Sequence, residues 1–178
     1  MGVFSFAKDI GDKIFNRDDA KHDAKSETNA SANTPATKTT AGTIAASSEP
    51  SAQSVANLLL RRIQQHNINI SDLKIKYNGT TDTAEISGKA KTQADREKAI
   101  IAIGNVQNVA KVVDSIDVEE DVPESTMYTV KSGDSLSKIA QNVYGSSNDY
   151  MKIFEANKPM LSEPDKIYPG QVLRIPKP

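Results

Sequence analysis

Few side chains in this chain of 178 residues are of the types that carry out enzyme chemistry. The sequence has no cysteine to act as a nucleophile, and only His22 and His66 could serve as a histidine base. Neither histidine stands in a Ser-His-Asp context, and no zinc-protease, phosphate-loop or dinucleotide motif occurs. We therefore expect a protein that is not an enzyme.

One group of acidic side chains has a composition that could suggest a metal site. It consists of Asp18, Asp19, His22, Asp23 and Glu27. No second histidine stands at ligand spacing, and without cysteine no thiolate can hold a metal. We interpret this group as a solvated, charged segment.

Composition restricts the possible partners. The formal net charge is -1, which argues against a nucleic-acid-binding protein. No run of about 18 apolar residues occurs, so we expect no transmembrane segment. Lys8, Asp9 and Asp12 interrupt the apolar residues near the N-terminus, unlike a secretory signal. We expect a cytoplasmic protein and a monomer.

The first 16 residues predict an amphipathic helix. Val3, Phe6, Ile10 and Ile14 recur at spacings of three and four residues. We expect this helix to dock on a domain, and a helix on a membrane surface is the less favoured alternative. Residues 17–52 are rich in Ala, Ser and Thr and poor in large apolar side chains. Such a segment buries too little surface to offset its backbone entropy, so we expect a disordered, flexible linker.

Residues 53–119 predict the order α-β-β-α-β. Val55, Leu58, Leu59 and Ile63 indicate one apolar face of the first helix. Apolar residues then alternate as in strands over 73–77, 83–88 and 112–118. We expect both helices to cover one face of a three-stranded sheet.

Two local signals support these elements. The turn at 78–82 contains Gly79, which we expect to supply the positive φ that tight turns need. Thr92 is the expected N-cap of the second helix. The element order, with the segments 84–90 (AEISGKA) and 104–112 (GNVQNVAKV), resembles a BON domain. Members of that family are linked to membrane association or to ligand binding.

Residues 127–178 follow a short acidic hinge at 120–126. The segment opens with 128–136 (YTVKSGDSL) and closes with 166–176 (KIYPGQVLRIP). These motifs resemble a LysM domain, a β-α-α-β module that usually binds N-acetylglucosamine-containing glycans such as peptidoglycan. The fold class is therefore expected to be α+β, with two small domains at 53–119 and 127–178.

The whole arrangement resembles the Kbp family of bacterial potassium-binding proteins, which combine a BON domain with a C-terminal LysM domain. The segments 154–161 (FEANKPML) and 164–176 (PDKIYPGQVLRIP) carry this resemblance most closely, and the linker at 17–52 departs from it. The resemblance implies K+ as the bound ligand and a cytoplasmic ion sensor that becomes more compact when the ion binds.

The resemblance and the chemistry of potassium together imply a site built from main-chain carbonyls. Potassium is large and monovalent, and neutral carbonyl oxygens replace its hydration shell, whereas carboxylate cages favour calcium. Carbonyls become free where a helix ends or a loop turns. The expected ligands are the carbonyls of Ala7, Ile10, Gly104, Val106 and Val109.

The LysM resemblance implies a second possible ligand, a glycan. Its expected contacts are Gly133, Asp134, Ser135, Leu136, Asn157, Pro159 and Ile167. The loop at 157–167 is longer than in many LysM domains, and it forms one wall of the glycan groove in that family. The alternative is that these residues only cap helices and close turns.

Overall fold

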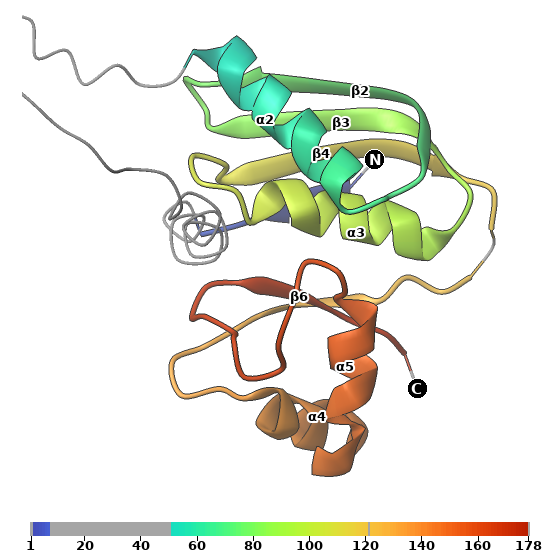
Figure 1. Ribbon diagram of the computed structural model, residues 1–178, viewed down its shortest axis with the longest axis vertical. Helices are drawn as coiled ribbons and strands as arrows, with labels where there is room; N and C mark the ends of the chain where they lie inside the picture. The colour runs from blue at the N-terminus through green and yellow to red at the C-terminus, as the bar shows by residue number, and fades with distance from the viewer. Residues whose placement is uncertain (1, 8–50, 121, 178) are drawn as a thin grey trace, which may run out of the picture.

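The computed structural model describes residues 2–7, 51–120 and 122–177. Its elements form two α+β units that follow one another along the chain (Figure 1). This confirms the fold class expected from the sequence. None of the helices in the described part of the chain is long and apolar enough to cross a membrane.

A four-stranded sheet forms the first unit. Its strands are β1 (Gly2–Ser5), β2 (Ile70–Asn78), β3 (Thr83–Ala90) and β4 (Lys111–Val118), in the order β1-β4-β3-β2. Strands β3 and β4 are parallel, and the other pairs are antiparallel. A parallel pair needs a crossover connection, which helix α3 provides here.

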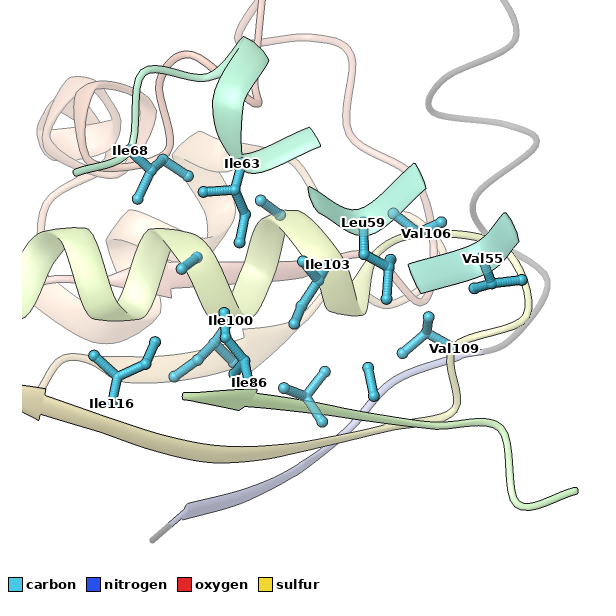
Figure 2. Close-up of a cluster of buried hydrophobic side chains, with 14 of the residues drawn as sticks. Val55, Leu59, Ile63, Ile68, Ile86, Ile100, Ile103, Val106, Val109 and Ile116 are labelled. Carbon is cyan, nitrogen blue, oxygen red and sulfur yellow. The ribbon is translucent and has the colours of Figure 1, made fainter. Parts of the chain in front are cut away.

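Helices α2 (Ala52–Gln65) and α3 (Gln93–Gly104) cover one face of this sheet (Figure 1). The side chain of Thr92 accepts a hydrogen bond from the Asp95 N–H, which confirms the expected N-cap. Apolar side chains from both helices and from the sheet meet in one core, as Figure 2 shows. Its largest fully buried members are Leu59, Ile63, Ile86, Ile100, Ile103, Val109 and Val112.

The sequence prediction was wrong for the start of the chain. Residues 2–5 form strand β1 at the sheet edge, and no helix begins there. Phe4 pairs with Val112, and the Phe6 N–H donates to the Ala110 carbonyl over 2.9 Å. The edge of β4 offers unpaired backbone groups, and residues 2–5 bond to them as a strand. The spacing of apolar residues in the sequence gives no sign of this edge. The rest of the expected helix, 8–16, and the expected linker up to residue 50 lie outside the described residues.

Three smaller expectations also need correction. The residue with positive φ in the β2–β3 turn is Asp82, with φ of 47°, and not Gly79. Leu58 is 47% exposed because it lies off the buried stripe of α2. Helix α2 begins at Ala52 with Ser51 as its N-cap, so the last two residues assigned to the linker belong to this helix.

The second unit follows the β-α-α-β order expected from its motifs. It contains β5 (Thr126–Thr129), α4 (Leu136–Tyr144), a 3-10 turn η2 (Ser147–Asp149), α5 (Tyr150–Ala156) and β6 (Val172–Ile175). Ser135 caps α4, and Gly145 ends it in the left-handed conformation, with φ of 77°. Strands β5 and β6 pair antiparallel.

The two units dock on each other through α3 and β6. The Asn105 side chain forms two hydrogen bonds with the backbone of Val172, each 3.0 Å long. Glu97 forms an ion pair with Arg174, and Met160 packs against the core of the first unit. The long loop at 157–167 therefore has a packing role, because it carries Met160.

The acidic hinge is bonded to α3 as well. Glu124 forms an ion pair with Arg96 at 2.7 Å, and the Ser125 N–H donates to Glu97 over 2.7 Å. Burial acts to raise the pKa of Glu97, but hydrogen bonds from Arg174, Gln93 and Ser125 outweigh it and leave this pKa below its usual value. The ionised Glu97 carboxylate on α3 therefore binds both the hinge, through Ser125, and β6, through Arg174.

Candidate functional site

The end of α3 and the loop that leads to β4 form the first candidate site. This segment contains the expected ligands Gly104, Val106 and Val109. Strand β1 pairs with β4 in a register that ends at Ser5 and Lys111, and Phe6 then bonds to Ala110. The structure thus brings Ala7 to the same loop, although about a hundred residues separate them in sequence.

Gly104 is needed here for close packing. A Cβ atom at this position would overlap the ring of Phe6, so only glycine lets the N-terminal segment lie against the end of α3. The loop residue with positive φ is Asn108, at 68°. Asparagine tolerates this left-handed conformation better than most residues.

The carbonyls of the loop fall into two groups. Those of Ile103 and Val106 accept N–H groups of the loop itself, over 3.2 Å each. The carbonyl of Asn108 accepts the Tyr77 hydroxyl over 2.6 Å. By contrast, no donor among the described residues reaches the carbonyls of Ala7, Gly104 or Val109. Three of the five expected ligand oxygens are therefore without a partner in the described part of the chain.

The remaining expected ligands differ from these three. The carbonyl of Val106 accepts a hydrogen bond from the Val109 N–H, and its second lone pair is available for another partner. Ile10 lies outside the described residues. Among residues 2–7, 51–120 and 122–177, no three acidic, histidine or cysteine side chains gather where they could hold a metal ion. The acidic group around His22 also falls outside the described residues.

Sequence reasoning missed Asn105, which lies between two of the expected ligands. Asn105 is 5% exposed. Its side-chain amide donates to the carbonyl of Val172 and accepts the N–H of Val172, which belongs to the second unit. The available signal was a polar side chain near the end of the otherwise apolar stretch 99–106. A buried amide needs hydrogen-bond partners, and here they come from the other unit.

The second candidate site is the expected glycan groove of the second unit. Most of its residues have structural roles. Asp134 accepts hydrogen bonds from the Tyr128 hydroxyl and the Lys131 N–H, both 2.8 Å long. The Lys131 N–H, with Tyr128 and nearby lysines, holds the pKa of Asp134 below its usual value. Ser135 caps α4, and Leu136 is buried.

Asn157 is the most constrained of these residues, with 1% of its surface exposed. Its amide nitrogen donates to the carbonyls of Ile153 and Arg174, each over 2.7 Å. Its amide oxygen accepts the Arg174 N–H over 2.8 Å. The bond to Ile153 closes the end of α5 and the two bonds to Arg174 join it to β6, so both amide groups of Asn157 already have partners.

The other groove residues are more open. A Cβ atom at Gly133 would meet nothing within 4 Å, and its φ of 84° suits glycine. Pro159 follows a cis peptide bond in the long loop, and Ile167 packs against the core of the second unit.

Comparisons with known proteins show which family the chain belongs to. Residues 128–176 match the model of the LysM domain family. The potassium binding protein Kbp of Escherichia coli O6:H1 is 39% identical over 177 residues, and the match covers 99% of both chains. The chain therefore belongs to the family of this potassium binding protein.

Two further relatives match over shorter segments. An uncharacterized protein of Deinococcus radiodurans is 55% identical over 60 residues, which are 34% of this chain and 22% of that protein. The uncharacterized protein YqbP of Bacillus subtilis is 39% identical over 59 residues, 28% of this chain and 27% of that protein. Both proteins are uncharacterized, so these two similarities suggest no function for the chain.

Proposed function

We propose that this chain is a binding protein for potassium, and that the ion is held by main-chain carbonyls where the N-terminal segment meets the end of α3. One observation carries the proposal. Strand β1 brings Ala7 to the α3–β4 loop, and the carbonyls of Ala7, Gly104 and Val109 have no donor among the described residues. The relative that matches the whole chain is named for potassium binding.

The donor chemistry fits this ion better than a divalent one. Carbonyl oxygens are neutral dipoles, and several of them can replace the hydration shell of a large monovalent cation. Calcium and magnesium sites use carboxylates, and the described residues offer no carboxylate cluster at this loop. Val106 and Ile10 complete the proposed ligand set.

An ion at this position would connect distant parts of the chain. Ala7 follows β1, whereas Gly104 and Val109 flank Asn105, which bonds the second unit. Binding should therefore fix the N-terminal strand and the contact between the two units together. This is the physical basis for the proposed compaction and ion sensing.

Thermal unfolding in matched chlorides of potassium, sodium and lithium tests the proposal. A ligand that binds only the folded state stabilises it by RT ln(1 + [L]/Kd), so Tm should rise with potassium concentration more than with the other ions. A chain that lacks residues 1–7 should lose this difference. Equal melting curves of the intact chain in all three salts would contradict the proposal.

A pair of glycine variants sharpens the test. Gly104→Ala forces Phe6 away from the loop and should remove the potassium dependence of Tm. Gly145→Ala strains a left-handed helix end in the second unit and should lower Tm equally in all three salts. If both variants keep the full potassium dependence, the ion binds elsewhere.

A glycan is the second candidate ligand, because the LysM family model matches 128–176 and Gly133 lies on an open surface. Calorimetry with soluble chitooligosaccharides tests it on the intact chain. Gly133→Val should weaken binding if the groove is used, whereas an exposed site at Val122 gives a matched control, Val122→Ala. No heat of binding would leave potassium as the ligand.

The cytoplasmic location, the monomeric state and the compaction on binding are further parts of the proposal. Cell fractionation tests the location, and light scattering after size exclusion tests the state of association. Small-angle X-ray scattering with and without potassium tests the compaction. An unchanged radius of gyration at saturating potassium would contradict an ion sensor of this kind.

A further inference from the structure

The open face of the sheet contains a pocket that the proposed function does not use. Helices α2 and α3 cover the opposite face (Figure 1). The pocket has a volume of about 310 Å³, which is at the lower end for small-molecule sites. It is lined by Lys74, Lys76, Glu85, Ile86, Ser87, Val113 and Ser115.

The strand register places three hydrogen-bond donors in one row across the pocket. Lys74 of β2 lies opposite Ser87 of β3, and Ser87 lies opposite Ser115 of β4. Adjacent strands are about 4.8 Å apart, so one ammonium group and two hydroxyls face the same small volume. Such a row matches a ligand with several acceptor oxygens close together.

The next row explains why the pocket is positive at one end. Lys76 lies opposite Glu85, so a positive and a negative side chain face each other across neighbouring strands. Within the described part of the chain, neither Lys74 nor the two serines form a hydrogen bond or ion pair with another side chain. The lining thus carries two lysines and one glutamate, and Lys74 is the lysine that stands opposite a serine and not opposite the carboxylate.

The rest of the pocket is apolar. Val113 lies beside Glu85 in the register, and Val3 of β1 pairs with Val113 from the other side. Val3 is 63% exposed, so an apolar shoulder continues from the pocket to the sheet edge. A ligand that joins an anionic group to a short carbon skeleton fits both parts.

We propose that this pocket binds the phosphate group of a small soluble molecule. The Lys74 ammonium group and the hydroxyls of Ser87 and Ser115 donate to three phosphate oxygens, and the carbon skeleton lies over Val113. Hydrogen bonds between an ammonium group and phosphate are among the stronger ones, because both partners are charged. The ligand class is a phosphate monoester.

A nuclear magnetic resonance titration of the intact chain tests this site, with glycerol 3-phosphate as the probe at constant potassium concentration. We expect saturable shifts of the Ser87 and Ser115 amides. Lys74→Ala should weaken binding about tenfold, the size expected for a hydrogen bond to a charged group, and Ser115→Ala about threefold. Lys74→Arg should stay within about twofold of the wild type because it keeps the charge.

Two controls decide between a built site and general charge. Glycerol should cause no shift, since it lacks the phosphate. Lys91→Ala removes an exposed lysine outside the pocket and should leave the affinity unchanged. The proposal is overturned if Lys91→Ala weakens binding as much as Lys74→Ala, or if no saturable shift appears.

Vesicles distinguish the two sources of a phosphate group. The small-molecule site predicts no sedimentation of the chain with phosphatidylglycerol vesicles beyond that of the Lys74→Ala variant. Sedimentation that depends on Lys74, without any shift by glycerol 3-phosphate, would assign the pocket to a membrane surface and overturn the soluble ligand.

Discussion

Two asparagine side chains bond the backbone along one edge of strand β6, one from its own unit and one from the other. Asn157 bonds the N–H and the carbonyl of Arg174, and Asn105 bonds the N–H and the carbonyl of Val172. Each amide thus acts as a short neighbouring strand for backbone groups that would otherwise lack partners. The same chemistry closes the fold of one unit and docks the two units.

The two contacts differ in their surroundings. Asn157 also bonds Ile153 within its own helix, so it is part of the second unit in any arrangement. Asn105 acts together with the ion pair between Glu97 and Arg174, whose side chains are 3% and 15% exposed. We therefore expect the inner contact to support folding of the second unit, and the outer contact to support docking of the two units.

The largest effect should come from the inner contact. Asn157→Ala removes three hydrogen bonds and leaves buried backbone groups of β6 without partners. We expect a loss of about 3 to 4 kcal/mol in the free energy of unfolding, at about 1 kcal/mol for each bond. Urea unfolding measures it. An unchanged midpoint would mean that the inner contact does not support the fold.

Breaking the ion pair should have the next largest effect, and it should fall on docking. Glu97→Gln leaves Arg174 without a charged partner in a largely buried place, at a cost of about 3 kcal/mol. Amide exchange should rise along the interface while the protection of the Ile139 and Ile153 amides persists. A loss of protection in the second unit would show that docking and folding are one event.

Asn105→Ala should weaken docking somewhat less. It removes two neutral hydrogen bonds, worth about 2 kcal/mol together. The variant should also bind potassium more weakly, because Asn105 lies between two proposed ligands. Asn142→Ala, on the exposed part of α4, is the matched control that should change neither property. Full potassium affinity in Asn105→Ala would separate the ion site from docking.

The smallest effect is a dependence of docking on acid. The folded pKa of Glu97 is lowered, so its charge contributes above the usual value of 4.5, and this contribution is lost as the pH falls through the lowered folded value. Small-angle scattering of the wild type should show the units separating as the pH falls below 4.5. The scattering of Glu97→Gln should not change with pH over this range, because the variant has no carboxylate to protonate at this position. Identical pH profiles would assign the change to other carboxylates.

Local signals in the sequence predicted the elements well. Thr92 is the N-cap that the sequence predicted, and Ser135, Gly145 and Gly170 are residue types that favour the caps and the turn they form, with a φ of 89° at Gly170. Such signals work because a cap or a turn depends on a few consecutive residues. The α+β class and the β-α-α-β order of the second unit followed from them.

Predictions that depended on distant partners fared worse. Val3 and Phe6 stand at a helical spacing, yet the edge of β4 makes their segment a strand. Val143 stands at a helical spacing from the buried Ile139, yet it is 44% exposed. The spacing of apolar residues tells which side chains share a face only once the segment is known to be a helix or a strand. Near the end of a chain, the neighbouring strand decides between the two.

The candidate sites divide in the same way. The sequence by itself determined which residue types are available, and it excluded cysteine chemistry and pointed to carbonyl ligands through a family resemblance. Only the tertiary structure decided that Gly104 is needed for the Phe6 ring and that Asn105 reaches Val172. The physical reason is that every residue has a backbone carbonyl, so residue types do not show which carbonyls will meet. Their positions, and the close contacts between segments, are set only when distant parts of the chain pack together.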